Sequence, residues 1–143
     1  MDKIIRVCDL MHKGVIACYP EDTIKEIAKM MDTYQIRSIV VMDETGEVWG
    51  LVSIMELIPL LGKDLEKIHA QEIMRPYKIE VDPQWPISEA VQLMKKRKIE
   101  HLVVIDPHAG VRRPIGILTS FDIVQFMAGL NHGHFELQLK MQS

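Results

Sequence analysis

Apolar residues in the first half of the chain follow a strand, helix, strand, strand, helix pattern. Residues 15–18 form a short apolar run that predicts a brief strand. A helical stripe with the spacing i, i+3, i+4 and i+7 follows, at Ile24, Ile27, Ala28 and Met31. The apolar runs at residues 39–42 and 48–52 predict two further strands, of which the first reads as buried on both faces. A last helix is expected to begin at Ser53.

The second half of the chain repeats this pattern at an offset of 63 residues. Its apolar runs are residues 79–81, 102–105 and 114–118, and its helical stripe is Ile87, Ala90, Val91 and Met94. Nine identical residues share the offset: Met11/Met74, Pro20/Pro83, Ile24/Ile87, Glu26/Glu89, Met31/Met94, Ile36/Ile99, Val40/Val103, Val41/Val104 and Asp43/Asp106. Three extra residues after Asp106 raise the offset to 66, so Ser53 corresponds to Thr119 and Glu56 to Asp122. A repeat of this size predicts two similar half-domains.

The two long helices are expected to begin at equivalent places by different means. Thr23 and Glu26 have the spacing of a capping box, in which each residue satisfies a backbone N–H of the other. The second copy has Pro86 instead, a residue that suits the first position of a helix.

These elements predict an α+β fold of two tandem β-α-β-β-α repeats, packed about a pseudo-twofold axis with a ligand cleft between them. We divide the chain into a first domain at residues 1–65, a second at residues 66–130 and a tail at residues 131–143. The charged stretch at residues 64–72 joins the two copies. Each copy has about 60 residues, close to the size at which one core is marginal, so we expect the copies to fold together.

Composition and charge exclude several classes of protein. The chain of 143 residues is 48% hydrophobic and 26% charged, as expected of a folded cytoplasmic protein, and no apolar run is long enough for a membrane helix. A formal charge of −3 and an expected lack of a concentrated basic stripe disfavour nucleic acid as a partner. Cys8 and Cys18 have no counterparts in the second copy, which favours reduced thiols over a disulfide or zinc site. We find no set of nucleophile, base and orienting group, so we do not expect an enzyme.

The repeated motifs resemble those of tandem cystathionine-β-synthase (CBS) domains. The likeness extends over residues 9–130 and rests on three segments that occur in the same order in each copy: 9–11 and 72–74, 36–39 and 99–102, and 50–57 and 116–123. The resemblance implies a disc-shaped regulatory pair that often dimerises and binds AMP, ADP, ATP or S-adenosylmethionine between the copies. We therefore expect a stand-alone, non-catalytic module that needs no cofactor, forms a homodimer and signals to a partner.

Thr119, Ser120 and Asp122 are the main candidate ligand residues. A helix that begins at Thr119 presents free backbone N–H groups to a phosphate, and the Thr119 and Ser120 hydroxyls add donors. The Asp122 carboxylate could accept both hydroxyls of a ribose. The same spacing, however, also describes a capping box that needs no ligand.

The resemblance implies further site residues in both copies. Ser53 and Glu56 are the counterparts of the Thr119 and Asp122 pair, but Glu56 departs from the aspartate usual in the family, which puts the first-copy site in doubt. Backbone groups that would hold adenine carry over to Tyr77, Lys78 and Ile79, and in the first copy to residues 14–16, including Ile16. His101 matches the segment that walls the base, although a histidine there is more often structural.

Some alternatives remain open at this point. Arg112 and Arg113, in the second-copy insertion, could reach phosphates or could simply be solvated. His132 and His134 with Glu136 could bind a metal, but such a tail usually binds nothing, and we predict no metal site. The alternative function is a ligand-free structural module for dimerisation or interaction.

Overall fold

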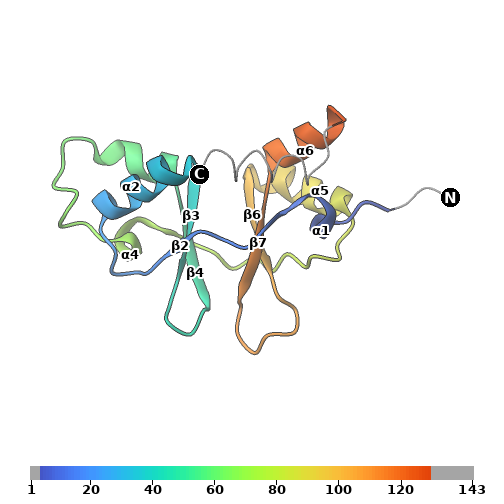
Figure 1. The fold of residues 1–143 in the computed structure, drawn as a ribbon, viewed down its shortest axis with the longest axis horizontal. Coiled ribbons are helices and arrows are strands. Elements are labelled where there is room, and N and C mark those ends of the chain that lie inside the picture. The colour runs from blue at the N-terminus through green and yellow to red at the C-terminus, as the bar shows by residue number, and fades with distance from the viewer. Residues whose placement is uncertain (1–3, 130–143) are drawn as a thin grey trace. The chain divides into compact units, whose positions relative to one another are not determined.

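The computed structural model describes residues 4–129, which form two compact units. Within these residues, unit 1 contains residues 4–14, 79–109 and 114–129, and unit 2 contains residues 15–78 and 110–113. Each unit combines a small sheet with helices (Figure 1), which confirms the predicted α+β fold of two tandem repeats. The tail residues His132, His134 and Glu136 lie outside the described part, so the prediction made for them stays a prediction.

Unit 2 is built around a four-stranded sheet with the strand order β2-β3-β4-β5. Strand β2 runs parallel to β3, while β3 with β4 and β4 with β5 are antiparallel. Its elements are β2 (Ala17–Cys18), α2 (Ile24–Tyr34), β3 (Ser38–Met42), β4 (Val48–Ser53), α3 (Ile54–Leu57), a 3-10 turn (Ile58–Leu60), α4 (Ala70–Ile73) and β5 (Arg75–Pro76). Of these, α4 and β5 were not predicted.

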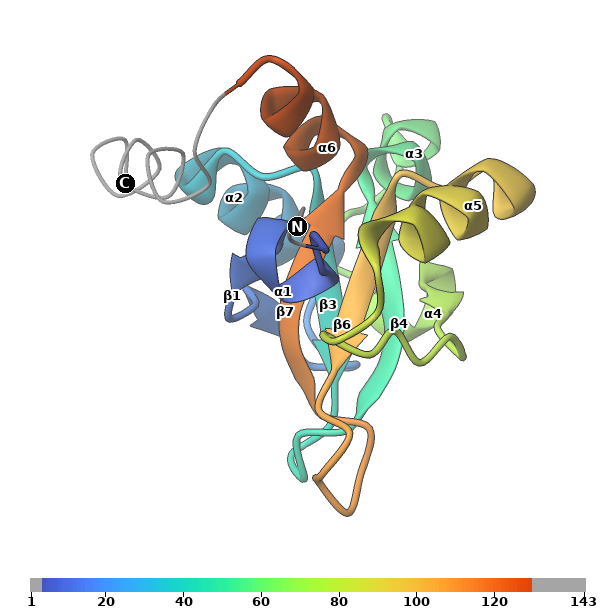
Figure 2. The ribbon, with the colours of Figure 1, turned by 90° about the vertical axis from the view of Figure 1, so that its right-hand side faces the viewer.

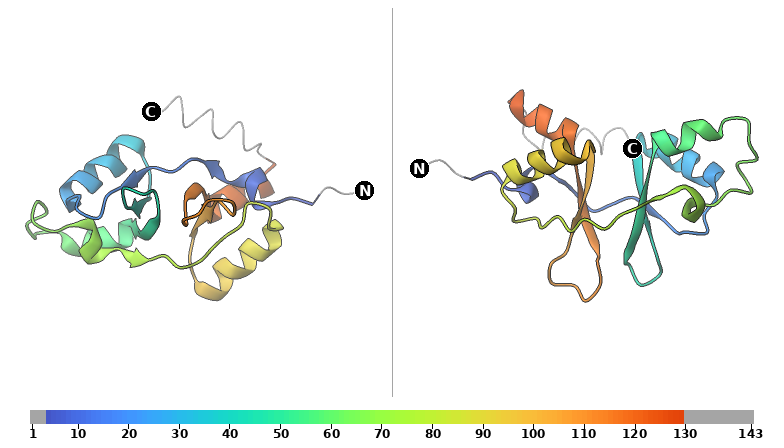
Figure 3. Two further views of the ribbon diagram at one scale, coloured as in Figure 1. Left: turned by 90° about the horizontal axis from the view of Figure 1, so that it is seen from below. Right: turned by 180° about the vertical axis from the view of Figure 1, so that it is seen from behind.

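Unit 1 has a three-stranded sheet with the order β1-β7-β6, in which both pairs are antiparallel. Its elements are α1 (Val7–Leu10), β1 (His12–Lys13), α5 (Ile87–Arg97), β6 (His101–Ile105), β7 (Pro114–Thr119) and α6 (Ser120–Met127). Figure 2 shows β1 and α1 beside β7. In each unit the helix that follows the hairpin, α3 or α6, lies at one end of the hairpin, and the hairpin turn lies at the other end (Figure 3).

The strand predicted at residues 79–81 is wrong as a full strand. In the structure it is reduced to one parallel bridge, between Val81 and Val104. This bridge occupies the same place as the pair of Cys18 and Val41 in β2 and β3. The fully buried Val81 side chain and the hydrogen bond from Ile105 N to Val81 O, at 2.9 Å, keep the segment in place.

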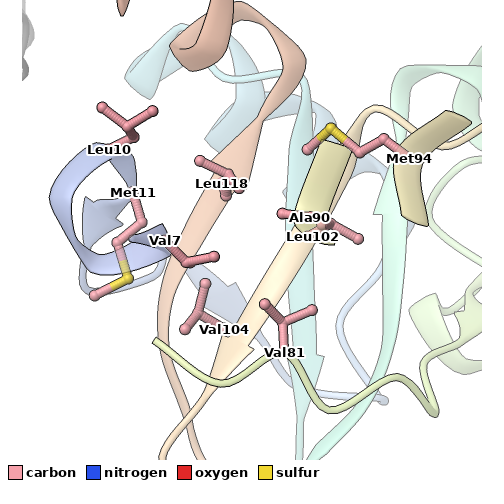
Figure 4. Close-up of a cluster of buried hydrophobic side chains, with 9 residues drawn as sticks. All are labelled: Val7, Leu10, Met11, Val81, Ala90, Met94, Leu102, Val104 and Leu118. Atoms are coloured by element: carbon pink, nitrogen blue, oxygen red, sulfur yellow. The ribbon is translucent and has the colours of Figure 1, made fainter. Parts of the chain in front are cut away.

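Each unit has its own apolar core. In unit 1 the buried cluster joins α1, α5, β6 and β7 (Figure 4) and consists of Val7, Leu10, Met11, Val81, Ala90, Met94, Leu102, Val104 and Leu118. In unit 2 the cluster consists of Cys18, Ile24, Ile27, Met31, Ile39, Val41, Val52 and Ala70. The predicted helical stripes face these cores, except that Val91 is 40% exposed because it lies at the edge of the stripe on α5.

The long helices begin and end at equivalent positions. Thr23 Oγ1 accepts a hydrogen bond from Glu26 N at 3.2 Å, as predicted. Pro86, expected inside the helix, is instead the residue just before it, with an extended ψ of 141°. Both helices end at a left-handed residue with φ of 54°, Gln35 in one and Lys98 in the other.

The segment that leads into each repeat packs in the unit of the other repeat. In unit 1, Val7 N donates to Trp85 O at 2.9 Å, and Ile87 N donates to Ile5 O at 2.8 Å. The equivalent bonds in unit 2 run from Ala70 N to Asp22 O at 2.8 Å and from Ile24 N to Ile68 O at 2.9 Å. The compact units therefore cut across the boundary drawn between the repeats at residues 65 and 66, a division that stays a description of the sequence.

Two glycines allow these lead segments to reach the sheets. A Cβ built on Gly50 would lie 2.6 Å from Arg75 O and 2.8 Å from the Met74 sulfur. A Cβ on the equivalent Gly116 would collide with His12 O and lie 2.9 Å from the Met11 sulfur. Any side chain at either position would thus push β5 off β4, or β1 off β7.

We predict that Gly116→Ala destabilises the protein by about 1 to 3 kcal/mol, because the added methyl group must displace backbone rather than a flexible side chain. Urea denaturation followed by circular dichroism measures the change. Gly110→Ala is the matched control, since Gly110 is exposed and nothing lies within 4 Å of the place that an added methyl group would take. Equal stability of the two variants would contradict the close approach.

Candidate functional site

Asp122 is buried at the start of α6, where it both caps the helix and faces His12. Its Oδ2 accepts a hydrogen bond from Thr119 N at 2.8 Å, and Thr119 Oγ1 accepts one from Asp122 N at 3.1 Å. The other oxygen, Oδ1, lies 2.8 Å from His12 Nε2, and the Asp122 side chain has no exposed surface. That short contact does not have the geometry of a hydrogen bond, so Oδ1 has an ionic neighbour but no hydrogen bond partner among the described residues.

Three other predicted residues accompany Asp122 in unit 1. Ser120 is the first residue of α6, and its N–H donates to Glu100 O at 2.9 Å. His101 opens β6 directly opposite Thr119, and it is half-buried. Ile79 is partly buried against the unit 1 core, and it is not part of a strand. The structure thus brings His101, Thr119, Ser120 and Asp122 together at one end of the β6–β7 hairpin.

Glu56 occupies the equivalent position in unit 2. Its Oε1 accepts hydrogen bonds from Ser53 N at 2.8 Å and from Ser53 Oγ at 2.9 Å. Its Oε2 accepts a hydrogen bond from Arg75 Nε at 3.1 Å, and the Glu56 side chain is 11% exposed. The predicted pair of Ser53 and Glu56 therefore also forms a helix cap whose second oxygen is engaged by a cation.

The basic residues beside the two carboxylates, His12 and Arg75, come from equivalent positions of the repeats. His12 lies in β1 and Arg75 in β5, 63 residues apart, which is the offset of the repeat in this region. Each of these short strands pairs with the hairpin strand that leads into the capped helix. Both units therefore contain the same arrangement of cap, carboxylate and cation, with His12 and Asp122 in one and Arg75 and Glu56 in the other.

The residues predicted to hold adenine through their backbone lie in unit 2, apart from Gly14 and Ile79, which belong to unit 1. Tyr77 is buried, and its N–H donates to Trp49 O at 3.2 Å. Lys78 is exposed, and the carbonyl of the half-buried Ile16 accepts a hydrogen bond from Val40 N at 3.2 Å. The Ile16 carbonyl is therefore part of the sheet, and Lys78 presents its ammonium group to solvent.

Arg112 holds backbone atoms of unit 2 instead of standing in solvent. Its Nη1 donates to Tyr77 O at 2.5 Å and its Nη2 to Val48 O at 3.0 Å, while Nε lies 3.8 Å from Glu47 Oε1. Both guanidinium Nη groups are thus committed to carbonyls. Arg113, the next residue, is exposed.

A protein-family model for the CBS domain matches residues 7–63 and again residues 70–129. The chain belongs to the CBS domain family. This confirms the resemblance and makes each repeat one CBS domain, with its final helix capped by Ser53 or Thr119.

Two curated relatives contain the CBS pair within a longer protein. The chain is 31% identical over 124 residues to the uncharacterized protein MK0525 of Methanopyrus kandleri. This alignment covers 85% of the chain and 62% of that protein. It is 28% identical over 126 residues to L-aspartate semialdehyde sulfurtransferase of Methanocaldococcus jannaschii. This alignment covers 88% of the chain and 24% of the enzyme. The chain thus spans less than two thirds of the length of these relatives.

A solved CBS pair has the same fold. The crystal structure of the CBS domain pair of protein MJ0100, in complex with 5′-methylthioadenosine and S-adenosyl-L-methionine, is 28% identical to the chain. The likeness covers 89% of this chain and 98% of that one, with a TM-score of 0.79.

Sequence reasoning missed His12, Arg75 and a basic run. A signal for the first two was present, because each follows directly after the repeated methionine, Met11 or Met74. The basic run, residues 95–98, consists of the last three residues of α5 and the residue after the helix, all exposed, contrary to the expected lack of concentrated basic charge. Cations in a last turn stabilise the negative end of the helix dipole, which accounts for the run structurally.

Residues 4–129 contain no cluster of three or more histidine, cysteine, aspartate or glutamate side chains that could hold a metal, and no helix long and apolar enough to cross a membrane. Burial, followed by the nearby Asp22 charge, raises the pKa of Cys18 to about 12, so this thiol stays protonated and unreactive.

We predict that Arg112→Ala destabilises the protein by about 1 to 3 kcal/mol, because two backbone carbonyls lose a charged donor. Thermal or urea denaturation measures the loss. Arg113→Ala, at the neighbouring exposed position, should change stability by less than about 0.5 kcal/mol. If both variants behave alike, the Arg112 contacts contribute nothing and the residue is free to serve a ligand.

Proposed function

We propose that the chain is a non-catalytic regulatory module that binds an adenosine-containing ligand and signals its presence to a partner protein. The observation that carries this proposal is the Asp122 carboxylate, which is buried at the start of α6 with one oxygen that lacks a hydrogen bond. Membership of the CBS family and the likeness to a CBS pair solved with methylthioadenosine and S-adenosylmethionine support the ligand class. AMP, ADP, ATP and S-adenosylmethionine are the candidates, and the chain needs no cofactor.

The proposed role of Asp122 follows from its chemistry. A carboxylate can only accept hydrogen bonds. The two adjacent hydroxyls of a ribose can both donate to it, which would hold the sugar in a fixed orientation. The Ser120 hydroxyl, at the first residue of α6, would serve a phosphate or the carboxylate of S-adenosylmethionine beside the ribose. Lys78 and Arg113 are exposed, and the role predicted for them in binding phosphates stays a prediction. Placement of the ligand between the repeats stays a prediction.

A regulatory rather than catalytic role is consistent with how the candidate residues are used. Both carboxylates close helix caps, and both lie beside a cation instead of beside a nucleophile. The CBS pair also matches only a quarter of the sulfurtransferase, so in that enzyme it accompanies other parts of the protein. The partner of this chain would be a protein or domain that reads the ligand-bound state, in the cytoplasm as the composition predicts.

We predict that Asp122→Asn weakens binding of the adenosine ligand by about tenfold or more, because hydroxyl bonds to a charged acceptor contribute about 1 to 3 kcal/mol. A thermal-shift screen with AMP, ADP, ATP and S-adenosylmethionine identifies the ligand, since an excess of a hundredfold over Kd stabilises by about 2.7 kcal/mol. Calorimetry then compares wild type, Asp122→Asn and the matched control Glu56→Gln, which should bind almost as wild type does. Unchanged affinity in Asp122→Asn with reduced stability would leave Asp122 as a helix cap alone.

The alternative function, a dimerisation module, is favoured by exposed apolar side chains at equivalent positions. Met55, Ile58 and Leu61 in unit 2 are more than half exposed. Their counterparts at the offset of 66 are Phe121, Val124 and Met127 in unit 1, which are also more than half exposed. We propose that these positions form a homodimer contact, because exposed apolar side chains gathered on the last helix of a repeat are suited to burial against a second copy.

We predict that Val124→Lys shifts the protein from dimer to monomer, since it places a charge in the apolar contact. Analytical ultracentrifugation across a range of concentrations measures the state. Val91→Lys is the control: Val91 is an exposed valine of unit 1 that lies on α5, outside the repeated patch. A wild-type monomer at all concentrations would remove the dimer proposal and leave ligand binding untouched.

A further inference from the structure

We propose that Arg112 is a positioning residue that holds the backbone of Tyr77 and Lys78 in the conformation that receives the base of the ligand. The inference rests on the proposed function, because this backbone is predicted to hold adenine. All three residues lie in unit 2. Arg112 would act through the backbone that it holds, without contacting the ligand itself.

The hairpin loop that carries Arg112 is longer in the second repeat than in the first. The loop between β6 and β7 comprises residues 106–113, whereas the loop between β3 and β4 comprises residues 43–47. Residues 110–113 of the longer loop pack as part of unit 2, although β6 and β7 belong to unit 1. At the offset of 66, Arg112 corresponds to Gly46, so the first repeat has no side chain at this position.

Arg112 is fixed to β4, and from there it reaches Tyr77. Val48 N donates to Arg112 O at 2.9 Å, and Arg112 Nη2 donates to Val48 O at 3.0 Å. The other terminal nitrogen, Nη1, donates to Tyr77 O at 2.5 Å. Tyr77 N in turn donates to Trp49 O at 3.2 Å. The N–H and the C=O of Tyr77 are therefore both held relative to β4.

The next residue, Lys78, has a backbone that is available to a base. Its N–H and C=O form no hydrogen bond with any residue in the range 4–129. A backbone donor beside a backbone acceptor matches an edge of adenine, where a ring nitrogen accepts and the amino group donates. Ordering a mobile backbone on binding costs conformational entropy, so a segment that Arg112 already holds would bind the base more tightly.

The first repeat shows that the fold does not require this arginine. Gly14 corresponds to Tyr77 at the offset of 63, and its N–H donates to Ile115 O at 2.7 Å, the counterpart of the bond from Tyr77 to Trp49. Within residues 4–129, no group donates a hydrogen bond to the Gly14 carbonyl. The equivalent segment thus joins its sheet without a clamp on its carbonyl, which favours a role for Arg112 beyond folding.

Adenosine and inosine are the probes for the test, because they share the ribose and differ in the donors and acceptors of the base. Calorimetry should show that wild type binds adenosine at least about tenfold more tightly than inosine. Arg112→Ala should weaken adenosine binding about tenfold and leave inosine binding almost unchanged, so the preference is lost. Arg112→Lys should behave similarly, because one ammonium group does not reproduce the fork of a guanidinium.

Arg37→Ala is the matched control, since Arg37 is an exposed arginine of unit 2 to which no role is assigned. It should keep the wild-type preference for adenosine. All variants are measured at a temperature at which circular dichroism shows them to be fully folded, so that a loss of stability alone does not change the affinity.

Three results would overturn the inference. An unchanged preference in Arg112→Ala would leave Arg112 with a stabilising role alone. Equal weakening of adenosine and inosine would show that Arg112 does not act through recognition of the base. Equal affinity of wild type for the two nucleosides would show that this backbone does not read the base. Absence of binding of either nucleoside to every variant would instead refute the proposed function.

An arm without ligand keeps these failures apart. Amide hydrogen exchange followed by NMR should be about tenfold faster at Tyr77 in Arg112→Ala than in wild type, and unchanged in Arg37→Ala. Faster exchange without any nucleoside binding would establish the clamp and refute only the ligand assignment. Unchanged exchange at Tyr77 in Arg112→Ala would overturn the inference whatever binds.

Discussion

The close approach of backbone at Gly50 and Gly116 is the constraint on which the arrangement of both units depends. At each glycine, a carbonyl and a methionine sulfur of the lead segment occupy the space that a side chain would need. This contact lets a strand of only two residues, β5 or β1, join the edge of a hairpin. The short strand in turn carries Arg75 or His12 to the start of the helix that follows the hairpin.

Geometry is shared by the two repeats of this chain, whereas side-chain chemistry differs between them. The cap, the carboxylate and the cation occupy equivalent positions in both units, and the helix caps use equivalent backbone atoms. The side chains are Ser53, Glu56 and Arg75 in one unit and Thr119, Asp122 and His12 in the other. One oxygen of the longer Glu56 side chain accepts hydrogen bonds from its cap residue, and the other accepts one from the arginine guanidinium. Glu56 is more solvent-exposed than Asp122, and both of its oxygens have hydrogen bonds. One scaffold therefore presents two carboxylates of unequal availability.

Much of the fold could be predicted because it is encoded in local patterns. The spacing of Ile24, Ile27 and Met31 predicted a helix whose buried face the structure confirms, and the long apolar runs predicted the hairpin strands. The elements that were missed are those without such a pattern. Strands β1 and β5 have two residues each, and helices α1 and α4 have four, too few for any periodicity to appear. Their positions depend on tertiary contacts such as those of Gly116, which no single sequence window contains.

The candidate site was predictable in the same uneven way. The capping spacing of Thr119 and Asp122 is local, and both of its hydrogen bonds are present. The partner of the other Asp122 oxygen is His12, 110 residues earlier in the sequence, so pattern reasoning gave no reason to join them. Arg112 was read as a solvated or phosphate-binding side chain, yet its nearest acceptors are backbone carbonyls that carry no sequence signal. Contacts between residues far apart in the sequence, such as that of His12 with Asp122, could therefore be identified only in the folded structure.

The capping and ligand-binding interpretations of Asp122 are compatible once its two oxygens are considered separately. The cap uses Oδ2, which accepts a hydrogen bond from the Thr119 backbone N–H. The ligand would use Oδ1, which has a cation beside it and no hydrogen bond. His12 is the neighbour of this second oxygen, and a buried carboxylate oxygen left without any partner is costly. Any ligand that draws His12 away must therefore supply its own donors to Oδ1, and two ribose hydroxyls are a group of the right kind and number to do so.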